Sequence, residues 1–206
     1  MSLYCFDLDD NVIYTDTMIK TKNGSVTTKQ FANNPKHRRN LPLDAFKHFK
    51  VESCMRCKIK RAKYYDKFIE CMTNNKHICV ITARSHPNKG LKIIIKRILQ
   101  KVKLPLYFNN RVKLYCVNNK HFSNIINKFM KKKRWPIKTA NAAKQLRDDI
   151  KKNRIDTCIK KRIALLDFTT MHPNAVTIGF SDDDNNNLNE MKKTLSLINM
   201  KTRVYN

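Results

Sequence analysis

Short apolar runs alternate with longer amphipathic stretches along this chain. The short runs are rich in β-branched and aromatic residues, as is typical of buried strands, and they cover residues 3–6, 78–82, 112–117 and 175–180. The longer stretches have a helical composition or helical spacing of apolar residues, and they cover residues 45–72, 89–102, 122–130, 138–153, 159–168 and 188–198. Strands that alternate with helices predict βαβ units, and hence an α/β fold whose parallel sheet is covered by helices on both faces.

Some stretches refine this prediction. Residues 89–102 give the clearest helix, because their aliphatic side chains fall on one face: Leu91, Ile94, Ile95, Ile98 and Leu99. Residues 45–72 are irregular in charge, which leaves open one helix or two. Asn23 and Gly24 form a favourable two-residue turn, so we expect a β-hairpin directly after the first strand. Residues 201–205 are expected to add an edge strand.

Composition adds a strong basic bias. The chain has 206 residues, enough for one domain, and a formal net charge of +27. Such a charge suits an acidic partner, such as a nucleic acid or a phosphoprotein. The abundance of Lys and Asn, with only 3 Gly, would also follow from AT-rich coding DNA, so the charge has a purely compositional alternative. No apolar run approaches the ~20 residues of a membrane span, and no signal peptide is expected, so we expect an intracellular protein that is neither secreted nor partnered with a membrane.

The cysteines also favour an intracellular protein. There are seven, an odd number, and most lie inside apolar runs, which is typical of reduced thiols that serve as small hydrophobic side chains. Cys54 and Cys57 have the spacing of a metal knuckle, but no second pair follows. A zinc site would therefore have to recruit a histidine such as His37 or His48.

A cluster of carboxylates follows the first apolar run. Asp7, Asp9 and Asp10 repel one another at the end of a buried strand, so they need a compensating charge. The carboxyl ends of parallel strands meet at one edge of the sheet. The second run ends there at Thr82 and the fourth in residues 181–184 (Ser-Asp-Asp-Asp). With a lysine from residues 160–162, this edge predicts a divalent-cation site facing an oxyanion site, and Mg²⁺ prefers such carboxylates together with phosphate oxygens.

In this order, these residues resemble the four motifs of the haloacid dehalogenase (HAD)-like phosphohydrolase superfamily. The motifs would be Asp7-Leu8-Asp9, Thr82, Lys161 and residues 181–183. More narrowly, FDLDDN, ITAR and GFSDDD are similar to a phage, viral and bacterial group within it. The resemblance implies a Rossmann-like HAD core with a β-hairpin flap after the first strand and only small cap insertions. A viral relative would act in the cytoplasm or nucleus of a host cell.

The resemblance also implies a role for each motif residue. Asp7 would attack phosphorus and form an aspartyl-phosphate, and Asp9 would protonate the leaving oxygen and later deprotonate water. Thr82 and Lys161 would hold the phosphoryl oxygens. Mg²⁺ would be bound by the side chains of three aspartates and the backbone carbonyl of a fourth: Asp7, Asp182, Asp183 and Asp9, respectively.

Several assignments stay open in the sequence. Lys160 is the alternative to Lys161, and the aspartates after the fourth run could instead cap the next helix. Asn11 stands where many relatives have Thr, and its amide can still hydrogen-bond locally. We regard Asn11 and Arg84 as candidate substrate-binding residues, and His86 could contact substrate as well.

The expected domain organisation bears on the substrate. We expect residues 1–206 to form a single HAD-like domain, with a hairpin flap and a small helical insertion at 13–77 and a helical insertion at 118–158. Neither insertion is long enough for a large lid, so we expect an open site that acts on a bulky or macromolecular phosphomonoester, either a nucleic-acid end or a phosphoprotein. The competing hypothesis is a catalytically weak or inactive HAD-fold module that binds nucleic acid or another acidic partner through its basic surface, with Asn11 as its direct support.

Overall fold

A five-stranded parallel sheet forms the centre of the protein in the computed structural model, which describes residues 1–38, 40–74, 76–85 and 88–205. The strands, in chain order, are β1 (Ser2–Phe6), β6 (His77–Thr82), β7 (Val112–Cys116), β8 (Thr177–Ser181) and β9 (Lys201–Tyr205). They lie in the order β7-β6-β1-β8-β9, and each neighbouring pair is parallel. The predicted α/β class is confirmed, and so is the edge strand at the C-terminal end.

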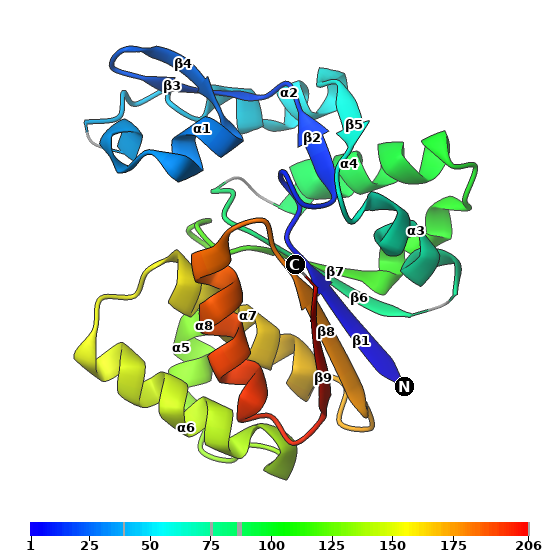
Figure 1. The fold of residues 1–206 in the computed structure, drawn as a ribbon, viewed down its shortest axis with the longest axis vertical. Coiled ribbons are helices and arrows are strands. Elements are labelled where there is room, and N and C mark those ends of the chain that lie inside the picture. The colour runs from blue at the N-terminus through cyan, green and yellow to red at the C-terminus, as the bar shows by residue number, and fades with distance from the viewer. Residues whose placement is uncertain (39, 75, 86–87, 206) are drawn as a thin grey trace.

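Helices cover both faces of this sheet (Figure 1). One face carries α5 (Phe122–Lys131), α6 (Ile137–Lys152), α7 (Thr157–Thr170) and α8 (Asn185–Ser196). The other carries α3 (Tyr65–Thr73) and α4 (Asn88–Lys101), and α2 (Val51–Arg56) packs against α4. Successive strand residues point to opposite faces, so Cys79 and Ile81 of β6 enter the first core while Ile78 and Val80 enter the second.

The apolar patterns that the sequence predicts are buried as expected. The aliphatic face of α4 is buried along its whole length, and it packs in the second core. All seven cysteines are free thiols, and all except the half-buried Cys158 are buried. The six buried cysteines therefore act as small apolar side chains within the two cores.

The stretch at residues 45–72 is two helices and not one. A short strand, β5 (Ile59–Arg61), separates α2 from α3 and pairs antiparallel with β2 (Ile13–Thr15). Three residues are too few to display the alternation of a strand, which is why the sequence pattern does not reveal this ribbon. Short 3₁₀ helices also occur in the connections: η1 (Pro35–Arg38), η2 (Lys47–Phe49) and η3 (Leu106–Arg111).

The predicted hairpin is present after the first strand, with its turn moved by one residue. Strands β3 (Met18–Thr21) and β4 (Gly24–Thr27) pair antiparallel, and Gly24 pairs with Thr21, so the turn residues are Lys22 and Asn23. Gly24 has a φ of 120°, which favours glycine at this position. Thr27 ends β4 because it forms a capping box with Gln30 and starts α1 (Thr28–Asn33).

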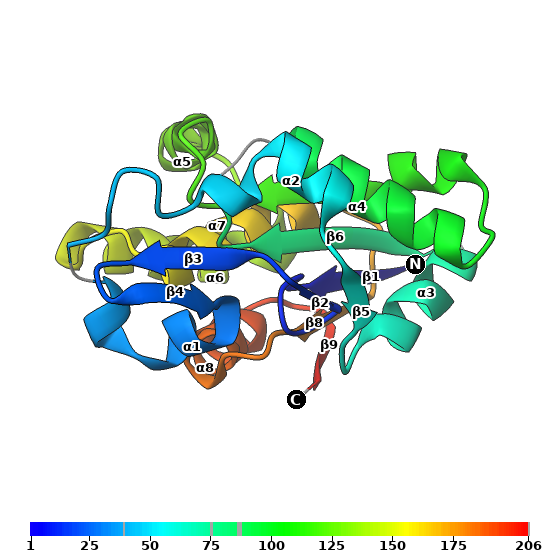
Figure 2. The same ribbon diagram turned by 90° about the horizontal axis from the view of Figure 1, so that it is seen from above.

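The segments that follow β1 lie beyond the carboxyl ends of the sheet strands. Figures 1 and 2 show the β2–β5 ribbon, the β3–β4 hairpin, α1 and α2 at this edge. They therefore face the edge at which the candidate site residues gather. None of the helices in the described parts of the chain has both the length and the apolar content needed to cross a membrane.

Candidate active site

Three carboxylates converge at the carboxyl edge of the sheet. Asp7 follows β1, and Asp182 and Asp183 follow β8, which is the neighbour of β1 in the sheet. Phe6 pairs with Ser181, and the backbone N–H of Asp7 donates to the Ser181 carbonyl at 2.9 Å, so strand register brings the three together. Each offers a carboxylate oxygen within 4.8 Å of the others. Within the described ranges this is the only such group of carboxylate, thiol or imidazole ligands that could hold a metal ion.

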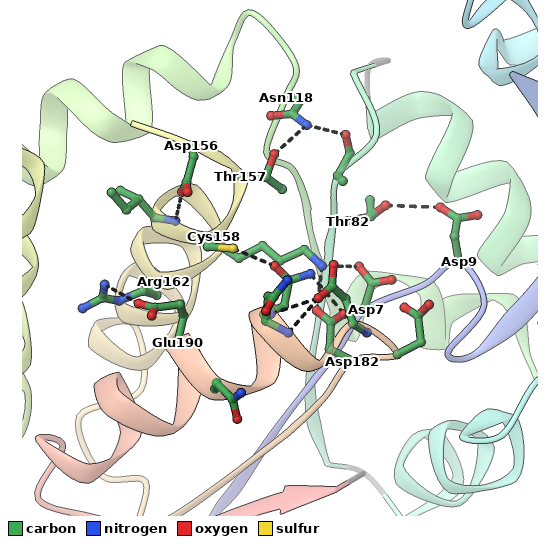
Figure 3. Close-up of a pocket in the computed structure, with 18 of the residues that line it drawn as sticks. Asp7, Asp9, Thr82, Asn118, Asp156, Thr157, Cys158, Arg162, Asp182 and Glu190 are labelled. Atoms are coloured by element: carbon green, nitrogen blue, oxygen red, sulfur yellow. Dashed lines mark hydrogen bonds and ion pairs between the residues drawn. The ribbon is translucent and has the colours of Figure 1, made fainter. Parts of the chain in front are cut away.

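Lys161 of α7 supplies the positive charge that this cluster requires. Its Nζ lies 2.9 Å from Asp7 Oδ1 and 2.6 Å from Asp182 Oδ2, and only 2% of the residue is exposed. Figure 3 shows Asp7 and Asp182 side by side in this arrangement. Successive helical residues point about 100° apart, and Lys160 accordingly turns away and donates to Asn118 Oδ1 at 3.0 Å. The structure thus places Lys161, and not Lys160, among the aspartates.

The cluster retains an excess of negative charge. Burial raises the pKa of Asp7, and the neighbouring aspartates raise it further, although Lys161 opposes them. Burial lowers the pKa of Lys161, but Asp182 and Asp7 outweigh this effect and raise it, so Lys161 remains an ammonium. Burial, then Asp182 and Asp10, raises the pKa of Asp183 to about 6. One ammonium thus faces three carboxylates, and this oxygen donor set fits Mg²⁺.

The raised pKa of Asp183 predicts how the stability of the metal-free protein depends on pH. Folded Asp183 keeps its proton up to about pH 6, whereas the ordinary pKa is 3.8, so between these values the native state binds more protons than the unfolded state. Its contribution to stability is therefore lost as the pH rises through this window. Asp183→Asn is expected to gain stability relative to wild type from about pH 4 to about pH 6.

Urea unfolding in EDTA at a series of pH values measures this difference. Asp66→Asn is the matched control, because the Asp66 side chain is 84% exposed. A difference between Asp183→Asn and wild type that does not change with pH would contradict the assignment.

Asn11 ties the loop after β1 to β8. Its Nδ2 donates to the Asp7 carbonyl at 3.1 Å and to Ser181 Oγ at 2.9 Å, and the residue is buried. Its Oδ1 is buried with no hydrogen-bond partner among the described residues. The preceding residue, Asp10, has a φ of 62° and accepts a hydrogen bond from Thr28 at the start of α1. The structure therefore places Asn11 next to Asp7, where its side chain links the Asp7 backbone to Ser181 by hydrogen bonds.

The side chain of Asp9 lies outside the carboxylate triad. Its Oδ1 accepts from Arg84 Nη2 at 2.6 Å, and its Oδ2 accepts from Arg84 Nε at 2.8 Å. The Thr82 hydroxyl donates to the same Oδ2 at 3.3 Å, as Figure 3 shows. Asp9, Thr82 and Arg84 thus form a second group beside the first. His86 lies outside the described residues.

The helix-capping alternative applies to one aspartate only. Asp184 is the N-cap of α8 and accepts from the backbone N–H of Asn186 at 2.8 Å. Asp182 Oδ1 instead accepts from Asn187 Nδ2 at 3.2 Å, while its Oδ2 faces Lys161. The acidic run therefore divides into a helix cap and site residues.

Comparison of the chain with protein-family models, with curated proteins and with solved structures finds no match.

A zinc site at Cys54 and Cys57 would need further ligands, and none is found among the described residues. Cys54 and Cys57 are buried, and the Cys54 thiol donates to the Phe49 carbonyl at 3.7 Å. In the described parts of the chain, no His, Asp or Glu joins this pair to make a metal-binding group. Neither His37 nor His48 therefore completes a site there.

A cleft of about 1470 Å³ opens over both groups of site residues. It exceeds the ~300–1,000 Å³ of ordinary small-molecule pockets. One wall is aromatic, and three phenylalanines from the segment after β1 contribute to it: Phe31, Phe46 and Phe49. More than half of the 16 acidic residues line the cleft, so most of the positive charge lies elsewhere. The sequence pattern does not single out these phenylalanines, because they lie in short, irregular elements.

Proposed function

We propose that this protein is a Mg²⁺-dependent phosphomonoester hydrolase of the HAD type, acting through an aspartyl-phosphate on Asp7. The observation that carries this proposal is the contact of the Asp7 carboxylate with the buried ammonium of Lys161, beside Asp182 and Asp183. A carboxylate nucleophile needs such a charge nearby, because the phosphoryl group it attacks is itself anionic. The motif resemblance, which covers residues from Tyr4 to about 191, supports the same assignment.

The proposed reaction proceeds in two balanced steps. A carboxylate oxygen of Asp7 forms a bond to phosphorus, the bond from phosphorus to the substrate oxygen breaks, and Asp9 gives its proton to that oxygen. Water then attacks phosphorus and gives a proton to Asp9, and the bond to Asp7 breaks to release inorganic phosphate. Lys161 and Thr82 hold the phosphoryl oxygens throughout.

The carboxylate triad is the proposed Mg²⁺ site. Asp7, Asp182 and Asp183 would hold the ion together with the backbone carbonyl of Asp9. When bound, Mg²⁺ supplies the positive charge that offsets the carboxylates and the phosphoryl group.

The size of the cleft and the charge of the chain favour a bulky substrate. The proposed substrate is a phosphorylated nucleic-acid end or a phosphoprotein, with residues 13–77 and 118–158 acting as small caps on a single domain. Because acidic residues concentrate in the cleft, a polyanion would contact the basic surface outside it and place only its phosphorylated end inside.

A substrate panel tests this proposal. Initial rates would be measured on p-nitrophenyl phosphate, nucleoside monophosphates, phosphopeptides and oligonucleotides with a 5′- or 3′-phosphate, each at several salt concentrations. We expect a lower KM for oligonucleotides than for mononucleotides, and a steep rise of that KM with salt, because backbone contacts release counterions. A KM for oligonucleotides that is no lower than that for mononucleotides and does not change with salt would exclude a nucleic-acid substrate. A lower KM for phosphopeptides would favour a phosphoprotein substrate.

One observation favours a second candidate function. Arg84 donates to both carboxylate oxygens of Asp9 and Thr82 donates to one of them, which leaves that carboxylate one open acceptor direction for proton transfer. A HAD-fold module with weak or no turnover that binds an acidic partner is consistent with this pairing. Absence of turnover with every phosphoester and metal tested, together with salt-sensitive nucleic-acid binding, would favour the module.

A further inference from the structure

Arg84 connects the candidate acid–base residue to a segment far away in the sequence. Two of its nitrogens bind the Asp9 carboxylate, and its Nη1 lies 3.7 Å from Cys54 Sγ. The centre of its guanidinium also lies 4.8 Å from the centre of the Phe49 ring. The Arg84 side chain is only 3% exposed. It is therefore held between the acidic loop after β1 and the segment that contains Cys54 and Phe49.

That segment, residues 46–57, contains η2 and α2 and extends to the aromatic wall of the cleft. The Phe46 ring lies 6.0 Å from the Phe49 ring and 5.8 Å from the Phe31 ring of α1. A second arginine, Arg97 of α4, anchors the same segment by donating to the carbonyls of Cys54 and Cys57 at 2.8 and 2.7 Å. The segment thus has two arginine anchors, of which Arg84 binds Asp9.

The contacts of Asp9 leave a single acceptor direction open. A carboxylate has about four acceptor sites, two on each oxygen. Oδ2 accepts from Arg84 Nε and from Thr82, whereas among the described residues Oδ1 accepts from Arg84 Nη2 alone. The planar guanidinium also fixes the plane of the carboxylate, which a single lysine contact would not do.

We infer that Arg84 is a positioning residue that orients Asp9, and that Oδ1 of Asp9 is the oxygen that exchanges a proton with the substrate. This inference rests on the proposed function, in which Asp9 acts as the acid and base. It replaces the expectation that Arg84 binds substrate, because the buried guanidinium would have to leave Asp9 to reach a phosphate. It also links the placement of residues 46–57 to the geometry of the reaction.

Two substrates that differ in leaving group test the inference. p-Nitrophenolate leaves without protonation, whereas the alcohol of glycerol phosphate needs an acid, so only the second depends on the orientation of Asp9. Arg84→Gln is expected to lower kcat for glycerol phosphate about ten-fold or more beyond its effect on p-nitrophenyl phosphate, with little change in KM. Arg84→Lys keeps the charge but not the planar fork, so it should show the same selective defect.

Arg97→Gln is the matched control, because it loosens the same segment without touching Asp9. It is expected to affect both substrates equally. A rise in KM for both substrates at unchanged kcat in Arg84→Gln would instead identify Arg84 as a substrate ligand. Equal losses of kcat on both substrates, in both variants, would reduce Arg84 to a structural role. Either result overturns the inference.

A measurement without turnover separates this inference from the proposed function. A wild-type protein that hydrolyses no phosphoester overturns the proposed function. The contact between Arg84 and Asp9 can still be tested by ¹⁵N NMR, through the Nε–H signal of Arg84. That signal is identified by its absence from the spectrum of Arg84→Lys. Loss of its protection from solvent exchange in Asp9→Asn, but not in Arg97→Gln, supports the orienting pair. An Arg84 signal that does not respond to Asp9→Asn overturns it.

Discussion

Asp7→Asn is expected to abolish Mg²⁺-dependent phosphomonoester hydrolysis, with a loss of at least about a thousand-fold in kcat. The amide has nearly the shape of the carboxylate but cannot attack phosphorus. Lys161 keeps its 2.6 Å contact with Asp182, so the variant should remain folded. Initial rates on p-nitrophenyl phosphate with Mg²⁺, together with a thermal melt of the same sample, measure both expectations.

The control for this variant lies at the same edge of the sheet. Asp184→Asn also removes one carboxylate from the cleft lining, but Asn is as good an N-cap as Asp, so α8 should keep its cap. Its kcat should stay within a few-fold of wild type. Hydrolysis that survives in Asp7→Asn would exclude the aspartyl-phosphate route.

Lys161→Met has the second large expected effect, on stability. In the metal-free protein it leaves the buried Asp7 and Asp182 without their shared ammonium, and breaking a buried ion pair in this way costs about 3–5 kcal/mol. Mg²⁺ should restore part of this loss, because the ion supplies positive charge to the same carboxylates. Urea unfolding in EDTA measures the loss of unfolding free energy, and urea unfolding in Mg²⁺ measures how much of it is restored.

Lys160→Met is the matched control for that experiment. Lys160 is the preceding residue of the same helix, but its Nζ contacts Asn118 outside the triad. Its free energy of unfolding should change by no more than about 0.5 kcal/mol. Two results would mean that Lys161 does not compensate the charge of a metal-binding cluster. One is an equal loss of unfolding free energy in Lys161→Met and Lys160→Met, and the other is no rise of that free energy on adding Mg²⁺ to Lys161→Met.

The sheet and the acidic triad could both be predicted from sequence. Buried parallel strands give continuous apolar runs, and they occur here at β1, β6, β7 and β8. Parallel strands also place their carboxyl ends at one edge, so Asp7 and Asp182 could be expected to meet although they lie far apart in the chain. These features follow from repeating backbone geometry, which a local pattern records well.

Other features depend on contacts that no local pattern records. The choice of Lys161 over Lys160 depends on the rotational phase of α7, which is fixed only when the helix packs. The Arg84–Asp9 pair depends on how residues 46–57 fold over the edge of the sheet. An arginine after Thr82 is visible in the sequence, but its carboxylate partner is not, because a guanidinium at this position would suit an anionic ligand equally well.

The proposed function requires that Asp7 becomes phosphorylated at a site completed by Asp182, Asp183 and Lys161. Acid quenching during Mg²⁺-dependent turnover, followed by borohydride reduction, converts an aspartyl-phosphate to homoserine, which mass spectrometry locates in the sequence. We expect homoserine at position 7, at a level that falls to background without Mg²⁺. Steady turnover that leaves Asp7 unmodified, or that places the label on another residue, would contradict it.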